Sequence, residues 1–190
     1  MMSTMKVTIF NGTPRKNGNT AAMTAILKEQ LLSQGIRAEE HFLYFADIKG
    51  CMNCGRCHSS PALNECAIKD GAPALLKKFV ASDVVIFASP VYMWHLTASL
   101  NAFIERLHSL CRHDDPAVNL MKGKKVAVAM TMGDDEYVAA DIVTSLLMFC
   151  EYFELKYKGA FAVPFASEEQ ISRPLYREKM QDFVSKLLKE

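Results

Sequence analysis

The chain has 190 residues, of which 50% are hydrophobic and 23% are charged, and its formal net charge is +1. This composition is typical of one globular domain, and so small a charge gives no basis for binding nucleic acid or an anionic membrane. No hydrophobic run approaches the roughly 20 residues that span a bilayer, and the first residues show no hydrophobic region of a signal peptide. We therefore expect a single cytoplasmic domain over residues 1–190 that binds neither nucleic acid nor a membrane.

Hydrophobic runs typical of strands alternate along the chain with segments of helical periodicity. Strands are predicted at residues 6–10, 37–44, 83–88, 124–131 and 155–163. Helices are predicted at residues 20–33, 72–81, 97–111, 136–153 and 174–189. The hydrophobic run at residues 84–87 is unbroken, which indicates a strand buried on both faces of a parallel sheet. The alternation predicts an α/β fold with a parallel sheet covered by helices on both sides.

The segment between the first strand and the first helix carries the strongest functional signal. Residues 11–20 read NGTPRKNGNT, a polar loop with glycines and two cations that leads into a helix. Such a loop, ending at the free N–H groups of a helix N-terminus, is the geometry that binds a phosphate. It lacks the Gly-Lys-Ser/Thr ending of a Walker A loop and the G-x-G-x-x-G pattern of dinucleotide sites. A phosphate monoester such as that of FMN is therefore the expected ligand.

Five strands with a phosphate loop after the first fit the flavodoxin-like fold, a three-layer sandwich with a five-stranded parallel sheet in the order 2-1-3-4-5. In this order ligands bind at the carboxyl ends of the strands, near the first and the third. The loop after the third predicted strand, residues 89–95, contains the aromatic residues Tyr92 and Trp94, and a planar ring needs such a wall. The loop at residues 131–135 can close the other side.

Three motifs resemble the family of NADPH-dependent FMN reductases and flavodoxin-like oxidoreductases: GTPR with GNT at residues 12–20, SPVY at residues 89–92, and LNAFIER at residues 100–106. The resemblance extends over nearly the whole chain, and Thr13 stands where the family usually has serine, which retains a hydroxyl. It implies that FMN is bound through its phosphate, through one side of its isoalloxazine ring, and through the loop that flanks the ring. The residues implied for these three roles are, in turn, Thr13, Arg15, Asn17, Gly18, Asn19 and Thr20; Pro90, Val91, Tyr92, Met93 and Trp94; and Thr131, Met132, Gly133 and Asp134.

Four of the six cysteines lie close together, at Cys51, Cys54, Cys57 and Cys66, within the irregular segment at residues 45–70. Thiolates two residues apart can each bind one iron at a corner of a cuboid cluster. The spacing resembles the iron-sulfur flavoprotein branch of this fold, which implies a [4Fe-4S] cluster, although the last spacer of eight residues is longer than in that branch. Three alternatives stay open: a zinc ion, with His58 as a possible substitute ligand; a redox-active dithiol; and a loop that binds no metal.

The resemblance implies an FMN-dependent oxidoreductase in which NAD(P)H gives hydride to flavin N5. The reduced flavin would then pass electrons to a quinone, a flavin or an electron carrier, so the partners are NAD(P)H and a small-molecule or protein acceptor. No protein side chain is assigned as catalytic, because the cofactor carries the chemistry. One alternative is an iron-sulfur flavoprotein that transfers electrons without direct NAD(P)H activity, and another is a flavodoxin-like binding module. A homodimer or homotetramer is expected from the family.

Overall fold

The computed structural model describes residues 5–59, 66–112, 114–115 and 117–189. Its centre is one five-stranded sheet, in which every neighbouring pair of strands is parallel and the order is β2-β1-β3-β4-β5. The flavodoxin-like strand order predicted from the sequence is therefore confirmed. The strands are β1 Val7–Asn11, β2 Ala38–Phe42, β3 Val84–Pro90, β4 Lys125–Thr131 and β5 Lys156–Val163.

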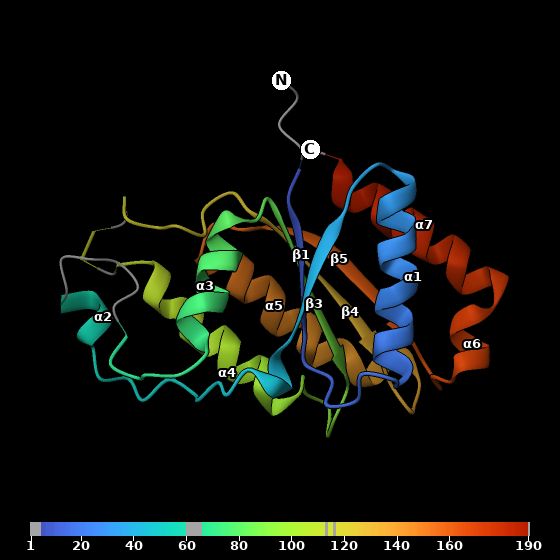
Figure 1. Cartoon of the computed structure of the whole chain (residues 1–190), viewed down its shortest axis with the longest axis horizontal. Coiled ribbons are helices and arrows are strands. Elements are labelled where there is room, and N and C mark those ends of the chain that lie inside the picture. Colours follow the sequence, from blue (N-terminus) through green and yellow to red (C-terminus); the bar gives the residue numbers. More distant parts are fainter. Residues whose placement is uncertain (1–4, 60–65, 113, 116, 190) are drawn as a thin grey trace.

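Helices cover both faces of the sheet and complete a three-layer sandwich (Figure 1). One face is covered by α1 Asn19–Ser33, α6 Glu168–Ser172 and α7 Pro174–Leu188. The other face is covered by α3 Ala72–Ala81, α4 Ala98–Arg106 and α5 Ala140–Tyr152. Among the residues that the structure describes, none of the helices combines the length and the apolar character that crossing a bilayer requires.

The unbroken hydrophobic strands fill two cores, because successive side chains of a strand point to opposite faces of the sheet. Ile9 packs in the core beneath α1 and α7, whereas its neighbour Phe10 packs in the core beneath α3, α4 and α5. The Phe10 ring is fully buried, and its centroid lies 4.5 Å from that of Phe103 in α4 and 6.2 Å from that of Phe79 in α3. This packing fixes the end of β1 and hence the start of the loop that follows.

The chain changes direction in the sheet between β1 and β3. The crossover from β1 to β2 runs through α1 on one face, and the crossover from β2 to β3 runs through α3 on the other (Figure 1). The carboxyl ends of β1 and β3 are neighbours, because Asn11 pairs with Ala88. Loops that leave two adjacent strands toward opposite faces open a crevice between them, and this is where such sheets bind ligands.

Several element bounds differ from those expected from the sequence, and the segment expected to be irregular at residues 45–70 contains a short helix, α2 Arg56–Ser59. The helix expected at residues 97–111 ends at Arg106 and tightens into a 3-10 helix, Leu107–Leu110, as helix ends often do. The helix expected at residues 136–153 likewise begins with a 3-10 turn, Glu136–Ala139, before α5. The short helix α6 was not expected; the Ser167 side chain caps it by accepting the Gln170 N–H at 3.0 Å.

Candidate functional site

The loop after β1 is held tightly between β3 and the first turn of α4. The Gly12 N–H donates to the Ala88 carbonyl at 2.8 Å, and the Ser99 hydroxyl donates to the Gly12 carbonyl at 3.3 Å. A Cβ atom on residue 12 would lie 2.1 Å from Thr97 Oγ1 and 2.9 Å from Leu100 Cβ. Glycine is therefore required here because the loop backbone runs against α4 without room for a side chain.

A buried polar network anchors the first residues of this loop. The fully buried Asn11 accepts the Thr13 N–H through Oδ1 at 2.9 Å and donates through Nδ2 to Glu40 Oε1 at 2.9 Å. Thr24 of α1 donates to the same Glu40 oxygen at 2.7 Å, and Lys28 pairs with the other. The network joins β1, β2 and α1 around the loop. Sequence reasoning missed Glu40, whose only signal is a carboxylate within a strand beside the predicted phosphate loop.

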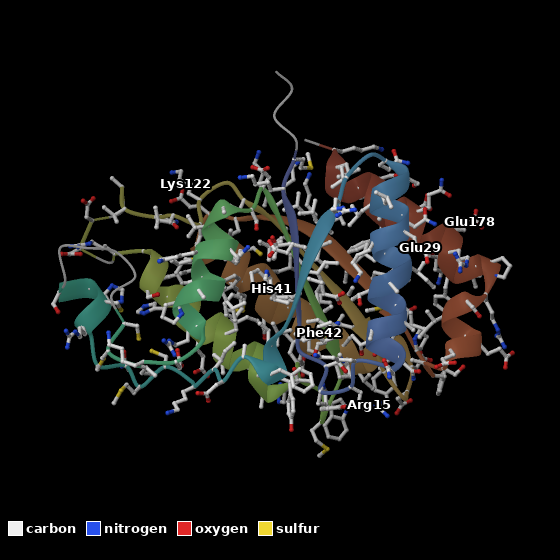
Figure 2. All side chains as sticks on the ribbon, viewed as in Figure 1. Arg15, Glu29, His41, Phe42, Lys122 and Glu178 are labelled. Atoms are coloured by element: carbon white, nitrogen blue, oxygen red, sulfur yellow. The ribbon has the colours of Figure 1, made fainter. Side chains whose placement is uncertain are left out.

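The N-terminus of α1 offers hydrogen-bond donors to an anion. Gly18 is the N-cap residue of this 15-residue helix, and among the described residues no side chain caps it and no acidic residue lies in its first turn. The Gly18 N–H donates to the Arg15 carbonyl at 3.2 Å, so a tight turn brings Arg15 beside the start of the helix. Figure 2 shows Arg15 at the carboxyl-terminal edge of the sheet. Free N–H groups, the positive end of the helix dipole and a guanidinium together fit a phosphate.

A cavity of about 190 Å³ opens next to this helix end. Four chain segments contribute to it, namely the start of α1 with the loop before it, the loop after β3, the loop after β4, and the segment after β5. The lining residues are Arg15, Asn19, Thr20, Pro90, Val91, Tyr92, Thr131, Met132, Gly133 and Ala166. Ala166 alone of these was not predicted. The cavity is smaller than the roughly 300 Å³ or more that buries a whole ligand, so it fits only part of a nucleotide.

Two side-chain contacts tie the cavity walls together. The Thr20 and Thr131 hydroxyls form a buried hydrogen bond of 2.7 Å between α1 and the end of β4. The Asn19 amide donates to the Ala166 carbonyl at 2.6 Å, which connects α1 with the segment after β5. The two threonines share one hydrogen bond but carry two O–H groups, so one remains to donate elsewhere. The start of α1 is therefore fixed against two other loops before any ligand binds.

Six of the fifteen residues predicted for FMN lie outside the cavity lining, including Thr13, Asn17, Gly18 and Asp134. Thr13 is 2% exposed, and its hydroxyl accepts the Arg15 N–H at 3.3 Å, so it shapes the loop from within. Asn17 is exposed in the turn before α1, and Gly18 contributes its backbone as the N-cap. Asp134 is also exposed, and its carbonyl accepts the Phe165 N–H at 3.3 Å. The structure thus brings nine of the fifteen predicted residues together around one cavity.

The remaining two predicted residues, Met93 and Trp94, form the tip of a tight turn after β3. Tyr92 and His95 exchange backbone hydrogen bonds of 2.9 and 3.0 Å, and this forces φ values of 49° and 64° on Met93 and Trp94. Large side chains rarely adopt this left-handed conformation, so the turn is strained. Met93 is 77% exposed and Trp94 is 55% exposed, whereas Tyr92 lines the cavity. The turn therefore presents two large apolar side chains to the surroundings at the rim of the site.

The four clustered cysteines surround one small pocket of about 20 Å³. Residues 60–65 of the same segment lie outside the described residues. Asn53 and Gly55 have φ values of 50° and 70°, and these left-handed residues curl the chain between the first three cysteines. Burial raises the pKa of the Cys57 thiol, and so do the nearby Cys66, Cys51 and Cys54. Cys57 therefore lies near the other three thiols.

As the structure describes them, the four thiols share a pocket but are not arranged around a single metal-ion position. Within residues 5–59 and 66–189, as far as they are described, no three Cys, His, Asp or Glu side chains are placed to hold a single metal ion. A tetrahedral zinc ion needs every ligand sulfur about 2.3 Å from one centre. A cuboid cluster instead takes each thiolate on a separate iron, so its sulfurs lie farther apart.

A buried ion pair closes the base of the cysteine segment. Arg106 Nη1 lies 2.6 Å from Asp70 Oδ2, and the two side chains are 1% and 0% exposed. Asp70 also accepts the N–H groups of Lys49 and Ala72, each at 3.0 Å. Burial alone would raise the pKa of Asp70, but these hydrogen bonds and the Arg106 charge lower it overall. Sequence reasoning missed this pair, because the two residues are 36 positions apart.

We expect Asp70→Asn to lower the free energy of unfolding at pH 7 by about 3–5 kcal/mol, because it leaves the buried Arg106 charge without its counterion. Since the pKa of Asp70 is lowered in the folded state, its charge stabilises above the unfolded pKa and this contribution is lost as the pH falls. The difference between wild type and variant should therefore shrink below about pH 4. Urea unfolding at several pH values measures it. Glu39→Gln, which removes an exposed ion pair with Lys78, should change stability by less than about 1 kcal/mol.

Comparison with known sequences identifies relatives. Residues 5–167 match the NADPH-dependent FMN reductase family. An iron-sulfur flavoprotein of Archaeoglobus fulgidus is 33% identical over 135 residues, which are 71% of this chain and 59% of that protein. An iron-sulfur flavoprotein of Methanosarcina thermophila is 30% identical over 129 residues, which are 68% of this chain and 63% of that protein. The chain thus spans less than two thirds of the length of these curated relatives.

Solved structures share the fold at low sequence identity. RosB, solved with bound 8-demethyl-8-formylriboflavin-5'-phosphate, superposes with a TM-score of 0.74 at 16% identity, over 95% of this chain and 76% of that one. An NAD(P)H:quinone oxidoreductase from Methanothermobacter marburgensis superposes with a TM-score of 0.71 at 14% identity, over 99% and 98%. These likenesses establish the fold, and the match over residues 5–167 establishes the family: the chain belongs to the NADPH-dependent FMN reductase family.

Proposed function

We propose that this protein is an FMN-dependent oxidoreductase that takes hydride from NAD(P)H and passes electrons to a small-molecule or protein acceptor. The observation that carries the proposal is the uncapped N-terminus of α1, which opens with Arg15 into a cavity at the carboxyl ends of the strands. A phosphate monoester fits this combination of donors. Membership of the FMN reductase family supports the same ligand.

The residues around the cavity would bind and orient the cofactor. The first-turn N–H groups of α1 and the Arg15 guanidinium would hold the phosphate, and the backbone and side chains of residues 90–92 and 131–133 would border the ring. Bound FMN would supply the hydride and electron transfer, so the chain needs no nucleophile or general base of its own. The contacts of Thr20 with Thr131 and of Asn19 with Ala166 would keep these walls in place before binding.

The phosphate contact is tested by comparing FMN with riboflavin, which lacks the phosphate. Arg15→Gln should weaken FMN binding about tenfold or more, the effect of losing a charge-assisted hydrogen bond, and should leave riboflavin binding unchanged. Lys16→Gln is the matched control, because the Lys16 ammonium lies 4.6 Å from the centre of the Phe45 ring. Fluorescence titration measures both affinities. Equal losses for both ligands in Arg15→Gln would show that this side chain does not meet the phosphate.

Hydride transfer is tested by mixing the FMN-loaded protein with NADPH or NADH in an anaerobic stopped-flow instrument. We expect either nucleotide to bleach the flavin absorbance, because hydride reduces the ring. A protein that dithionite bleaches but neither nucleotide bleaches would instead be an electron carrier reduced by another protein. A protein that takes up no FMN would be a binding module of a different kind. The pyridine-nucleotide preference follows from the same traces.

We further propose that Cys51, Cys54, Cys57 and Cys66 hold a [4Fe-4S] cluster that accepts electrons singly from the reduced flavin. The arrangement of the four cysteines around one pocket supports it, and so do relatives named iron-sulfur flavoprotein. Such a cluster would let the protein accept two electrons as hydride and release them one at a time.

Anaerobic purification followed by metal and flavin analysis tests the cluster. We expect about four irons per chain in the wild type, and loss of iron without loss of FMN in Cys66→Ser, because the thiolate is the iron ligand. Cys150→Ala, a change in the buried core, is the control that should keep both cofactors. Zinc in place of iron would indicate a single-ion site, and protein free of both metals would favour a thiol role.

We also propose that the protein is cytoplasmic and forms a homodimer or homotetramer. None of the six cysteines, all of which the structure describes, forms a disulfide, which suits a reducing compartment such as the cytoplasm. A homodimer or homotetramer would bury the exposed Met93 and Trp94 at the rim of the site.

A further inference from the structure

The segment that carries the four cysteines is closed at its base by contacts that need no metal. Asp70 Oδ2 accepts the Lys49 N–H at 3.0 Å, so residues 21 positions apart are joined directly. Arg106 bridges the same two residues: Nη1 donates to the Lys49 carbonyl at 2.9 Å and to Asp70 Oδ2 at 2.6 Å, while Nη2 lies 3.3 Å from Asp70 Oδ1. The ion pair is buried, so the base of the segment is fixed whatever the segment binds.

The neighbouring residue of α4 holds the first cysteine. Glu105 Oε2 accepts the Cys51 N–H at 2.9 Å. A Cβ atom on residue 50 would lie 2.9 Å from the same oxygen, so Gly50 permits this close approach. Glu105 itself is exposed, which places this contact on the outer side of the helix. The chain therefore enters the cysteine segment along a path set by a single carboxylate.

Arg106 stays charged at the base of the segment, where Asp70 is its counterion. Burial lowers the pKa of Arg106, but the hydrogen bond and charge of Asp70, with a smaller contribution from Cys66, raise it overall, so the group stays charged. Its Nε donor is buried and has no hydrogen-bond partner among the described residues. A permanent positive charge thus lies at the base of the cysteine segment, where it joins Lys49 and Asp70.

We propose that Glu105 and Arg106 are positioning residues that hold the cysteine segment ready for its metal before any metal binds. Glu105 holds the backbone of the first cysteine, and Arg106 joins Lys49 to Asp70, which flank the four cysteines. The inference rests on the proposed cluster at those thiols. Ordering a long segment costs conformational entropy. Contacts that already fix the two described ends of the segment leave less of this cost to the binding step, so the bound metal is retained more tightly.

Two measurements on FMN-loaded protein test the role of Glu105. In the metal-free protein, the hydrogen-exchange rate of the Cys51 amide reports on the contact with Glu105. After reconstitution with ferrous iron and sulfide, the rate at which a chelator removes iron reports on the metal site. Glu105→Ala should raise both rates about tenfold, the effect of losing a hydrogen bond to a charged group. Glu105→Gln keeps an acceptor oxygen and should restore most of the protection. Glu151→Ala, at an exposed glutamate in the last turn of α5, is the matched control and should change neither rate.

Arg106→Lys tests the second residue, because lysine keeps the charge but loses the planar fork. It should also speed iron loss about tenfold, because one ammonium cannot reproduce the paired contacts to Asp70 and Lys49. Iron loss at the wild-type rate in this variant would contradict positioning by the guanidinium. Circular dichroism first establishes that the variant folds; if it does not, the two Glu105 variants decide the proposal.

The outcomes separate this inference from the proposed cluster. Wild-type protein that takes up no iron would remove the cluster itself. Wild-type protein that holds iron, together with a Glu105→Ala variant that exchanges Cys51 and loses iron at wild-type rates, would overturn the positioning role alone. Faster exchange spread evenly over the chain in Glu105→Ala would also overturn it, because that pattern reports a loss of global stability.

Discussion

The hydrogen bond between the Gly12 N–H and the Ala88 carbonyl is the contact on which the candidate site depends. It joins the carboxyl ends of β1 and β3, where the chain changes direction in the sheet. With no side chain on Gly12, the loop lies directly against α4, and the polar network around Asn11 and Glu40 fixes it from the other side. The N-terminus of α1 and Arg15 then open into the cavity as a consequence. Preorganised donors of this kind cost little to order when a ligand binds.

Helix α4 connects the two regions of chemical interest. Its first turn contacts the loop through Thr97 and Ser99, and its last turn holds the cysteine segment through Glu105 and Arg106. Nine residues at 1.5 Å each make the helix about 13 Å long. One rigid element therefore sets the position of the cysteine segment relative to the loop after β1. A substitution that shifts one end of α4 would therefore also shift the residues that contact its other end.

Both regions contain features that cost stability and are retained. Met93 and Trp94 occupy left-handed conformations that large side chains avoid, and Arg106 with Asp70 places two charges in the interior. Strain of the first kind is typical of functional loops, and a buried ion pair is weak evidence for stability in itself. Their positions, one at the rim of the cavity and the other at the base of the cysteine segment, agree with roles in binding and positioning.

The sequence by itself determined the sheet and the polar loop between β1 and α1. Unbroken hydrophobic strands such as residues 84–87 and polar residues 11–20 before a helix are local patterns, and local patterns can be read from neighbouring residues. Only the tertiary structure decided which predicted residues share a cavity: Thr20 meets Thr131 and Asn19 meets Ala166 across more than a hundred positions. The same holds for Glu40 and for Arg106 with Asp70, because such partners are brought together by packing between distant elements and leave no periodic signal along the chain.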